Sequence, residues 1–100
     1  MSTIDIVHSL NGVPIRLTNE RWDHIVSNKP YMATYREAVL ASVESPAWIL
    51  RGYAGSLVAV VTRGKGAYLH VIYKEVSNDD GFIITAFIAH KYNRRMIVWP

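Results

Sequence analysis

The sequence predicts a single α+β domain, in which two N-terminal helices pack on a four- to five-stranded antiparallel sheet. Its length of 100 residues suits one domain and leaves no room for a second. Hydrophobic residues make up 50% of the chain and charged residues only 19%, whereas disordered chains show the opposite balance. Helical spacing of apolar residues ends near residue 43, and β-branched and aromatic residues dominate residues 46–99, which should form the sheet.

A short hairpin over residues 4–17 is expected first. The β-prone runs Ile4–Val7 and Val13–Leu17 flank Asn11-Gly12, a pair that adopts positive φ at low cost and is typical of hairpin turns.

Two helices should then cover residues 19–43. Thr18 stands where an N-cap belongs, and Lys29-Pro30 ends the first helix after Asn28. The second helix runs from about Tyr31 to Val43, before Ser45-Pro46. The side chains expected to face inward are Trp22, Ile25 and Val26 in the first helix and Met32, Tyr35, Val39 and Val43 in the second. Arg21, His24 and Asn28 follow the same spacing on a neighbouring strip, so His24 should lie at the border of core and solvent.

Four strands should follow the helices, at Trp48–Arg51, Leu57–Arg63, Tyr68–Val76 and Phe82–Ala89, with Met96–Trp99 packing back as a final strand or turn. Glycine and Asx residues in the connections 63–66 and 78–81 predict hairpins, hence antiparallel neighbours. Alternation places Tyr68, His70, Ile72 and Lys74 on one face and Leu69, Val71 and Tyr73 in the core. Thr85 should share the more open face with Ile83 and Phe87, opposite Phe82, Ile84, Ala86 and Ile88.

Several classes of function are disfavoured. The chain has no cysteine, which rules out disulfides, thiolate zinc sites and cysteine nucleophiles. Its four histidines lack the close spacing of a metal site, and no phosphate-binding glycine loop is present, so we expect neither a metal nor a cofactor. Neither a leader nor a long apolar run is seen, and with the lack of cysteine this predicts a cytoplasmic protein without a membrane partner.

The remaining polar residues suit metal-free RNA cleavage. That reaction needs a base for the ribose 2′-hydroxyl, an acid for the leaving oxygen and cations for the phosphorane charge. His24 and His70 are acid/base candidates, since histidine titrates near neutral pH. The cations available are Arg21, Arg63, Lys74 and Lys91, and Thr85 offers a hydroxyl. The alternative for each is structural: a boundary histidine, a solvated strand lysine and a β-forming threonine.

Three motifs resemble one nuclease superfamily. Ile15-Arg-Leu-Thr-Asn-Glu-Arg-Trp-Asp-His-Ile25, the strand Leu69–Val76 and the run Asp79–Phe87 are similar to motifs of small stand-alone prokaryotic proteins in the phage-associated branch of the barnase, EndoU, colicin and RelE-like (BECR) superfamily. The resemblance implies a metal-independent ribonuclease of toxin type, with two helices over the sheet whose open face forms the cleft. It also implies Arg21, His24, Lys74 and Thr85 as active-site residues and an antitoxin or immunity protein as partner. Phe87 stands where relatives commonly have tyrosine.

Two other functions stay open. One is a catalytically inactive module on the same scaffold that binds RNA or an acidic protein. In either RNA-related reading, the RNA-binding residues would be Arg63, Lys65, His70, Lys91 and Arg94, with Arg95 adding to the basic tail. The other is a protein-protein role as a homodimer through an exposed sheet edge.

Overall fold

One mixed sheet of seven strands organises the chain. The structure is a computed structural model and describes residues 4–100. The strands are β1 (Ile4–His8), β2 (Pro14–Thr18), β3 (Trp48–Arg51), β4 (Leu57–Thr62), β5 (Tyr68–Ser77), β6 (Asp80–Ala89) and β7 (Ile97–Trp99), in the spatial order β1-β2-β6-β5-β4-β3-β7. The helices are α1 (Asn19–Asn28) and α2 (Arg36–Glu44), with 3-10 turns η1 (Pro30–Thr34), η2 (Tyr53–Gly55) and η3 (Arg94–Met96).

The α+β class fits, but the predicted sheet of four to five antiparallel strands is wrong. The N-terminal hairpin β1-β2 joins the sheet, because β2 runs parallel to β6 with Arg16 opposite Phe82. The remaining neighbours pair antiparallel, as the short connections 63–66 and 78–81 predict for β4-β5 and β5-β6. At the other edge β7 pairs with β3. The hairpin thereby extends the sheet past the edge that β6 would otherwise form.

The helices begin and end partly as predicted. Thr18 is the N-cap of α1, and its Oγ1 accepts a hydrogen bond from the Arg21 backbone N–H at 3.0 Å. The prediction of one continuous second helix from Tyr31 to Val43 is wrong, because a 3-10 turn at Pro30–Thr34 precedes α2. Tyr35, which lies between the two, has φ −107° and ψ 11°. The predicted inward residues Met32, Val39 and Val43 are nonetheless fully buried. None of the helices in residues 4–100 is long and apolar enough to cross a membrane.

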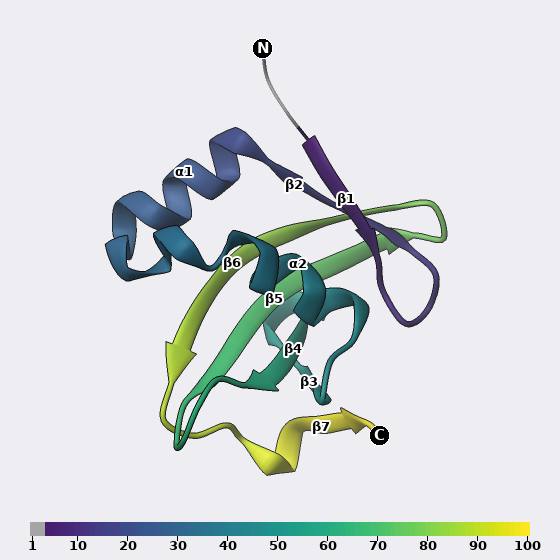
Figure 1. Cartoon of the computed structure of the whole chain (residues 1–100). Helices are drawn as coiled ribbons and strands as arrows, with labels where there is room; N and C mark the ends of the chain where they lie inside the picture. Colours follow the sequence, from purple (N-terminus) through teal and green to yellow (C-terminus); the bar gives the residue numbers. More distant parts are fainter. Residues whose placement is uncertain (1–3) are drawn as a thin grey trace.

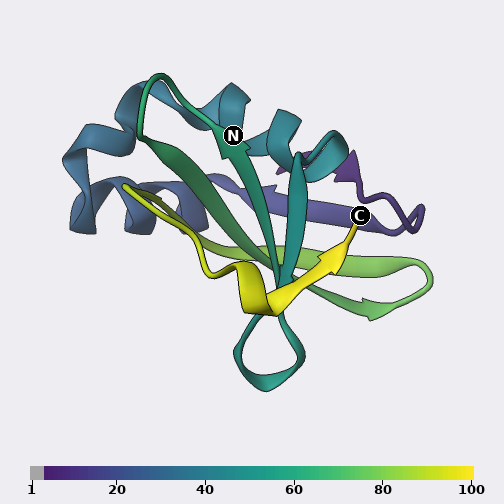
Figure 2. The ribbon, with the colours of Figure 1, turned by 90° about the horizontal axis from the view of Figure 1, so that it is seen from below.

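Both α-helices cover the same face of the sheet (Figure 1). The core between them contains Ile15 and Leu17 of β2, Leu69 and Val71 of β5, and Ile25 and Val39 of the helices. A smaller cluster lies on the opposite face, where Leu50, Val58 and Val60 pack beneath the aromatic residues Trp48, Tyr68 and Tyr92. Figure 2 shows the helices on one side of the strands and the C-terminal turn η3 on the other. The face away from the helices, which we call the open face, is therefore partly covered.

An irregularity in the pairing of β5 with β6 changes which side chains face the helices. Ile72 pairs with Thr85, but the next residue, Tyr73, pairs with Ile83, so Ile84 is an extra residue. Ile83 is consequently buried in the core, and Phe82 lies opposite Lys74 on the open face. The predicted faces of Ile83 and Phe82 are therefore wrong. Thr85 and Phe87 do share the open face with Ile72 and His70, as predicted.

Candidate nucleic-acid site

The exposed strip of α1 carries two of the predicted catalytic residues. Arg21, His24 and Asn28 are exposed at helical spacing, and the Asn28 side-chain amide lies 3.3 Å from His24 Nε2. An amide NH₂ group only donates, so Nε2 is the acceptor and the neutral imidazole carries its proton on Nδ1. His24 is thus held by its own helix, with Nδ1–H outside this hydrogen bond.

The side chain of Arg21, in the first turn of α1, lies on the side of the helix near β6. With His24, Thr18 and Glu20 it lines a hollow of about 270 Å³. It also lines a neighbouring hollow of about 160 Å³ with Phe82 and Ile83 of β6. The nearby Arg16 is paired with Asp80 at 2.9 Å. Within residues 4–100 only Arg16 and Arg36 have a carboxylate within ion-pair distance, which leaves the Arg21 guanidinium available to an anion.

Thr85 lies within reach of the end of the same helix. Lys29, which directly follows α1, donates from Nζ to Thr85 Oγ1 at 3.2 Å. Arg21 at the start of α1 shares a hollow with Phe82, and Lys29 just after the end of α1 bonds Thr85. The helix α1 therefore lies along β6. We call Arg21, His24, Asn28, Lys29 and Thr85 the α1-β6 seam.

Lys74 is separate from this group. It lies opposite Phe82 on the open face, and its Cε is 3.9 Å from the position that a Cβ at Gly55 would occupy, beside the β3-β4 loop. Lys74 lines neither of the two hollows that Arg21 lines, and no hydrogen bond in residues 4–100 joins it to Arg21 or His24. The structure brings Arg21 and His24 together, connects Thr85 to the same helix through Lys29, and leaves Lys74 on the far side of Phe82.

A third hollow, of about 440 Å³, lies on the open face. Its floor comes from four strands and consists of Leu50, Val58, His70, Ile72, Phe87 and Ala89. Its wall is the segment after β6, with Lys91, Tyr92 and Asn93. We call residues 90–96 the C-terminal strap and this hollow the strap groove. Two predicted RNA-binding residues, His70 and Lys91, meet in it.

His70 lies in the floor of the strap groove. Its side chain is buried, with 6% of the residue exposed, and its ring stacks on Phe87 at 4.7 Å between centroids and 15° between planes. His70 Nδ1 lies 3.1 Å from the Tyr68 carbonyl oxygen, which can only accept, so Nδ1 carries a proton. Burial lowers the pKa of His70 below its usual 6.5, and the hydrogen bond to Tyr68 opposes that shift. The neutral ring with a bare Nε2 is therefore favoured.

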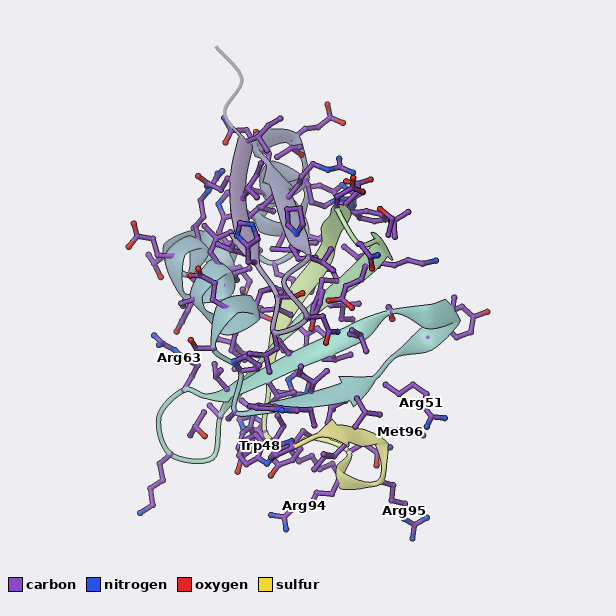
Figure 3. All side chains as sticks on the ribbon, turned by 90° about the vertical axis from the view of Figure 1, so that its right-hand side faces the viewer. Trp48, Arg51, Arg63, Arg94, Arg95 and Met96 are labelled. Carbon is purple, nitrogen blue, oxygen red and sulfur yellow. The ribbon has the colours of Figure 1, made fainter. Side chains whose placement is uncertain are left out.

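The other predicted RNA-binding residues lie on different sides of the molecule. The Arg94 guanidinium lies 5.6 Å from the centre of the Tyr92 ring, next to the strap groove. The Arg63 guanidinium lies 5.4 Å from the Tyr35 ring, which packs against the core beside the helices. Lys65 is exposed in the β4-β5 turn. Figure 3 shows Arg63 well apart from Arg94 and Arg95, so His70, Lys91 and Arg94 form one group and Arg63 is not part of it.

Sequence reasoning missed Lys29, Tyr92 and Asn93. The Lys29-Pro30 pair predicts only the end of a helix, and no local pattern predicts that the Lys29 side chain reaches Thr85. A signal for the strap did exist, because Tyr68, Ile72 and Phe87 make the open face too apolar to remain uncovered. Tyr92 supplies that cover by stacking on Trp48, with centroids 4.5 Å apart.

Comparison of the chain with known protein families, curated proteins and solved structures finds no match. Among residues 4–100 no group of three or more His, Asp or Glu side chains could hold a metal ion.

Proposed function

We propose that this protein is a metal-independent endoribonuclease of toxin type whose reactive groups lie in the α1-β6 seam. The observation that carries the proposal is the shared hollow of Arg21 and His24, which adjoins the hollow that Arg21 shares with β6. A proton-transfer group beside an unpaired guanidinium is what RNA cleavage without a metal requires.

Each residue then has a role. In this mechanism the ribose 2′-hydroxyl attacks the phosphate, leaving a 2′,3′-cyclic phosphate on one product and a 5′-hydroxyl on the other. Neutral His24 would accept the proton of the 2′-hydroxyl at Nε2, in place of the hydrogen bond from Asn28, and the resulting imidazolium would give its Nδ1 proton to the departing 5′ oxygen. Arg21 would bind the phosphate oxygens in the bidentate manner that guanidinium allows. Lys29 and Thr85, joined at 3.2 Å, would hold the phosphate from the β6 side, with Lys74 adding positive charge on the open face.

The decisive measurement is cleavage of total RNA and of a single-stranded oligoribonucleotide in excess EDTA. We expect the wild type to cleave and His24→Ala to lose activity by about 10²-fold or more, as is typical when a general acid or base is removed. The products should carry 2′,3′-cyclic phosphate ends.

The matched control is His8→Ala. His8 is an exposed histidine on β1, so this variant should cleave like the wild type. Equal activity of His24→Ala and wild type, with both folded, would contradict the assigned role. Absence of cleavage by all three proteins, after any copurifying inhibitor is removed, would favour the non-catalytic RNA-binding module.

A further inference from the structure

The strap groove has an unused hydrogen-bond acceptor. Nδ1 of His70 is engaged with Tyr68, and within residues 4–100 no protein group bonds Nε2. In the same part of the chain, every side-chain nitrogen or oxygen that is fully buried has a hydrogen-bond partner. Nε2 must therefore touch the solvent of the groove, although the rest of the His70 ring is buried. A buried ring with one accessible acceptor suits a ligand that presents an N–H group.

The groove also has the shape and surface that a flat ring needs. Its volume of about 440 Å³ lies within the range of about 300–1,000 Å³ typical of small-molecule sites. The floor is mostly apolar, and the His70 and Phe87 rings, which stack on each other, both line it. Asn93 and Lys91 add polar groups at the wall. A planar heterocycle could bury its faces here and direct its polar edge to Nε2.

Charge favours a nucleotide over a neutral heterocycle. Lys91 lines the groove and Arg94 packs on Tyr92 beside it. Arg51, Arg94 and Arg95 extend from the same end of the molecule in Figure 3. A phosphodiester chain leaving the groove would meet these cations.

The groove lies next to Thr85 of the candidate catalytic seam. Ile72 lines the groove and is the register partner of Thr85, which Lys29 bonds from the helix side. Phe87 shares the face of Thr85. A strand of RNA whose phosphate lies at Thr85 could therefore place a neighbouring base in the groove.

We infer that the strap groove binds one unpaired base of the RNA substrate, with His70 Nε2 accepting a hydrogen bond from an N–H on the edge of that base. This inference rests on the proposed function. It makes His70, Phe87 and Lys91 the site that selects single-stranded RNA, because a base that is paired and stacked in a duplex cannot turn into the groove.

Measurements of RNA affinity test this inference separately from catalysis. The affinity of His24→Ala for fluorescein-labelled hexauridylate is compared with its affinity for a hexamer of the same backbone that lacks bases. We expect the base-bearing RNA to bind about tenfold more tightly, the usual effect of one stacked and hydrogen-bonded base. Adding Ala89→Leu, which fills the groove, should remove that difference, while the matched Ala41→Leu on the exposed side of α2 should preserve it.

A second variant tests the acceptor. His70→Phe keeps an aromatic ring on Phe87 but has no Nε2, and we expect it to weaken hexauridylate binding about tenfold. A hexamer of 3-methyluridine lacks the N–H, so it should bind wild-type and His70→Phe proteins equally. His8→Phe is the control.

Equal affinity for the base-bearing and base-free hexamers, or no effect of Ala89→Leu and His70→Phe in folded proteins, would overturn the groove inference even if RNA is cleaved. Base-dependent binding without cleavage by the wild type would instead overturn the proposed enzyme and keep the groove.

Discussion

At the scale of single residues, the burial of His70 has a consequence for stability that can be measured apart from any ligand. The folded protein lowers the pKa of this imidazole by desolvation. The unfolded chain therefore binds a proton at a higher pH than the folded protein does. Unfolding is then accompanied by proton uptake in the interval between the two pKa values, so the free energy of unfolding falls as the pH falls through that interval.

We expect the wild type to lose stability relative to His70→Phe as the pH is lowered from 8 through 6.5 toward 5. Above pH 7.5 the imidazole is neutral in both states and adds no pH dependence. The slope contributed by one proton is at most about 1.4 kcal/mol per pH unit. Urea unfolding of both proteins at a series of pH values measures it. Parallel profiles for wild type and His70→Phe would show that burial does not shift this group.

At the scale of elements, the unexpected feature is the contact of β2 with β6. The hairpin and the strands after residue 46 were predictable, because Asn11-Gly12, the later turns and the alternation of Leu69, Val71 and Tyr73 are local signals. The parallel pairing of Arg16 with Phe82 joins segments far apart in the chain, and no local pattern encodes it. The same is true of the extra residue Ile84, since alternation assumes an unbroken period of two.

Gly81 allows β2 and β5 to approach β6 closely, and its replacement should lower the stability of the fold. A Cβ at Gly81 would lie 2.6 Å from Ile15 Cδ1 on β2 and 2.6 Å from the carbonyl oxygen of Lys74 on β5. Because one of these neighbours is backbone, we expect Gly81→Ala to lower the free energy of unfolding by about 3 kcal/mol, the upper end of the usual cost of overpacking.

The control for this effect is Gly64→Ala in the β4-β5 turn. Its φ is +72° and a Cβ there would meet nothing within 4 Å, so only the left-handed backbone is penalised, by roughly 1 kcal/mol. Denaturant unfolding compares the two. A Gly81→Ala variant no less stable than Gly64→Ala would mean that the strands separate easily at this point.

At the scale of the whole molecule, the candidate site could be predicted only in pieces. Helical spacing places Arg21 beside His24, and strand alternation places Thr85 on the face of His70. Which cations join them depends on tertiary packing: Lys29 reaches Thr85, while Lys74 lies beside the β3-β4 loop. The nine residues of the strap groove come from four strands and the strap, so the site exists only in the assembled fold.

The distribution of charge over the molecule leads to the last prediction. The chain has a net charge of +3, but Arg94 and Arg95 belong to the strap, whereas Arg63 packs on Tyr35 away from it (Figure 3). If single-stranded RNA leaves the groove along the strap, these two arginines contact phosphates and release counterions. Replacing both with glutamine should then reduce the slope of log affinity against log salt by roughly 1.4, at about 0.7 per phosphate contact.

The matched variant removes the same charge elsewhere. Arg63→Gln combined with Lys65→Gln alters the β4-β5 turn, and we expect it to change the slope much less. Fluorescence anisotropy with labelled hexauridylate from 50 to 300 mM salt measures both, in the His24→Ala background. A larger effect of the turn variant would mean that RNA crosses the helix side of the molecule, and the path through the strap groove would then be wrong.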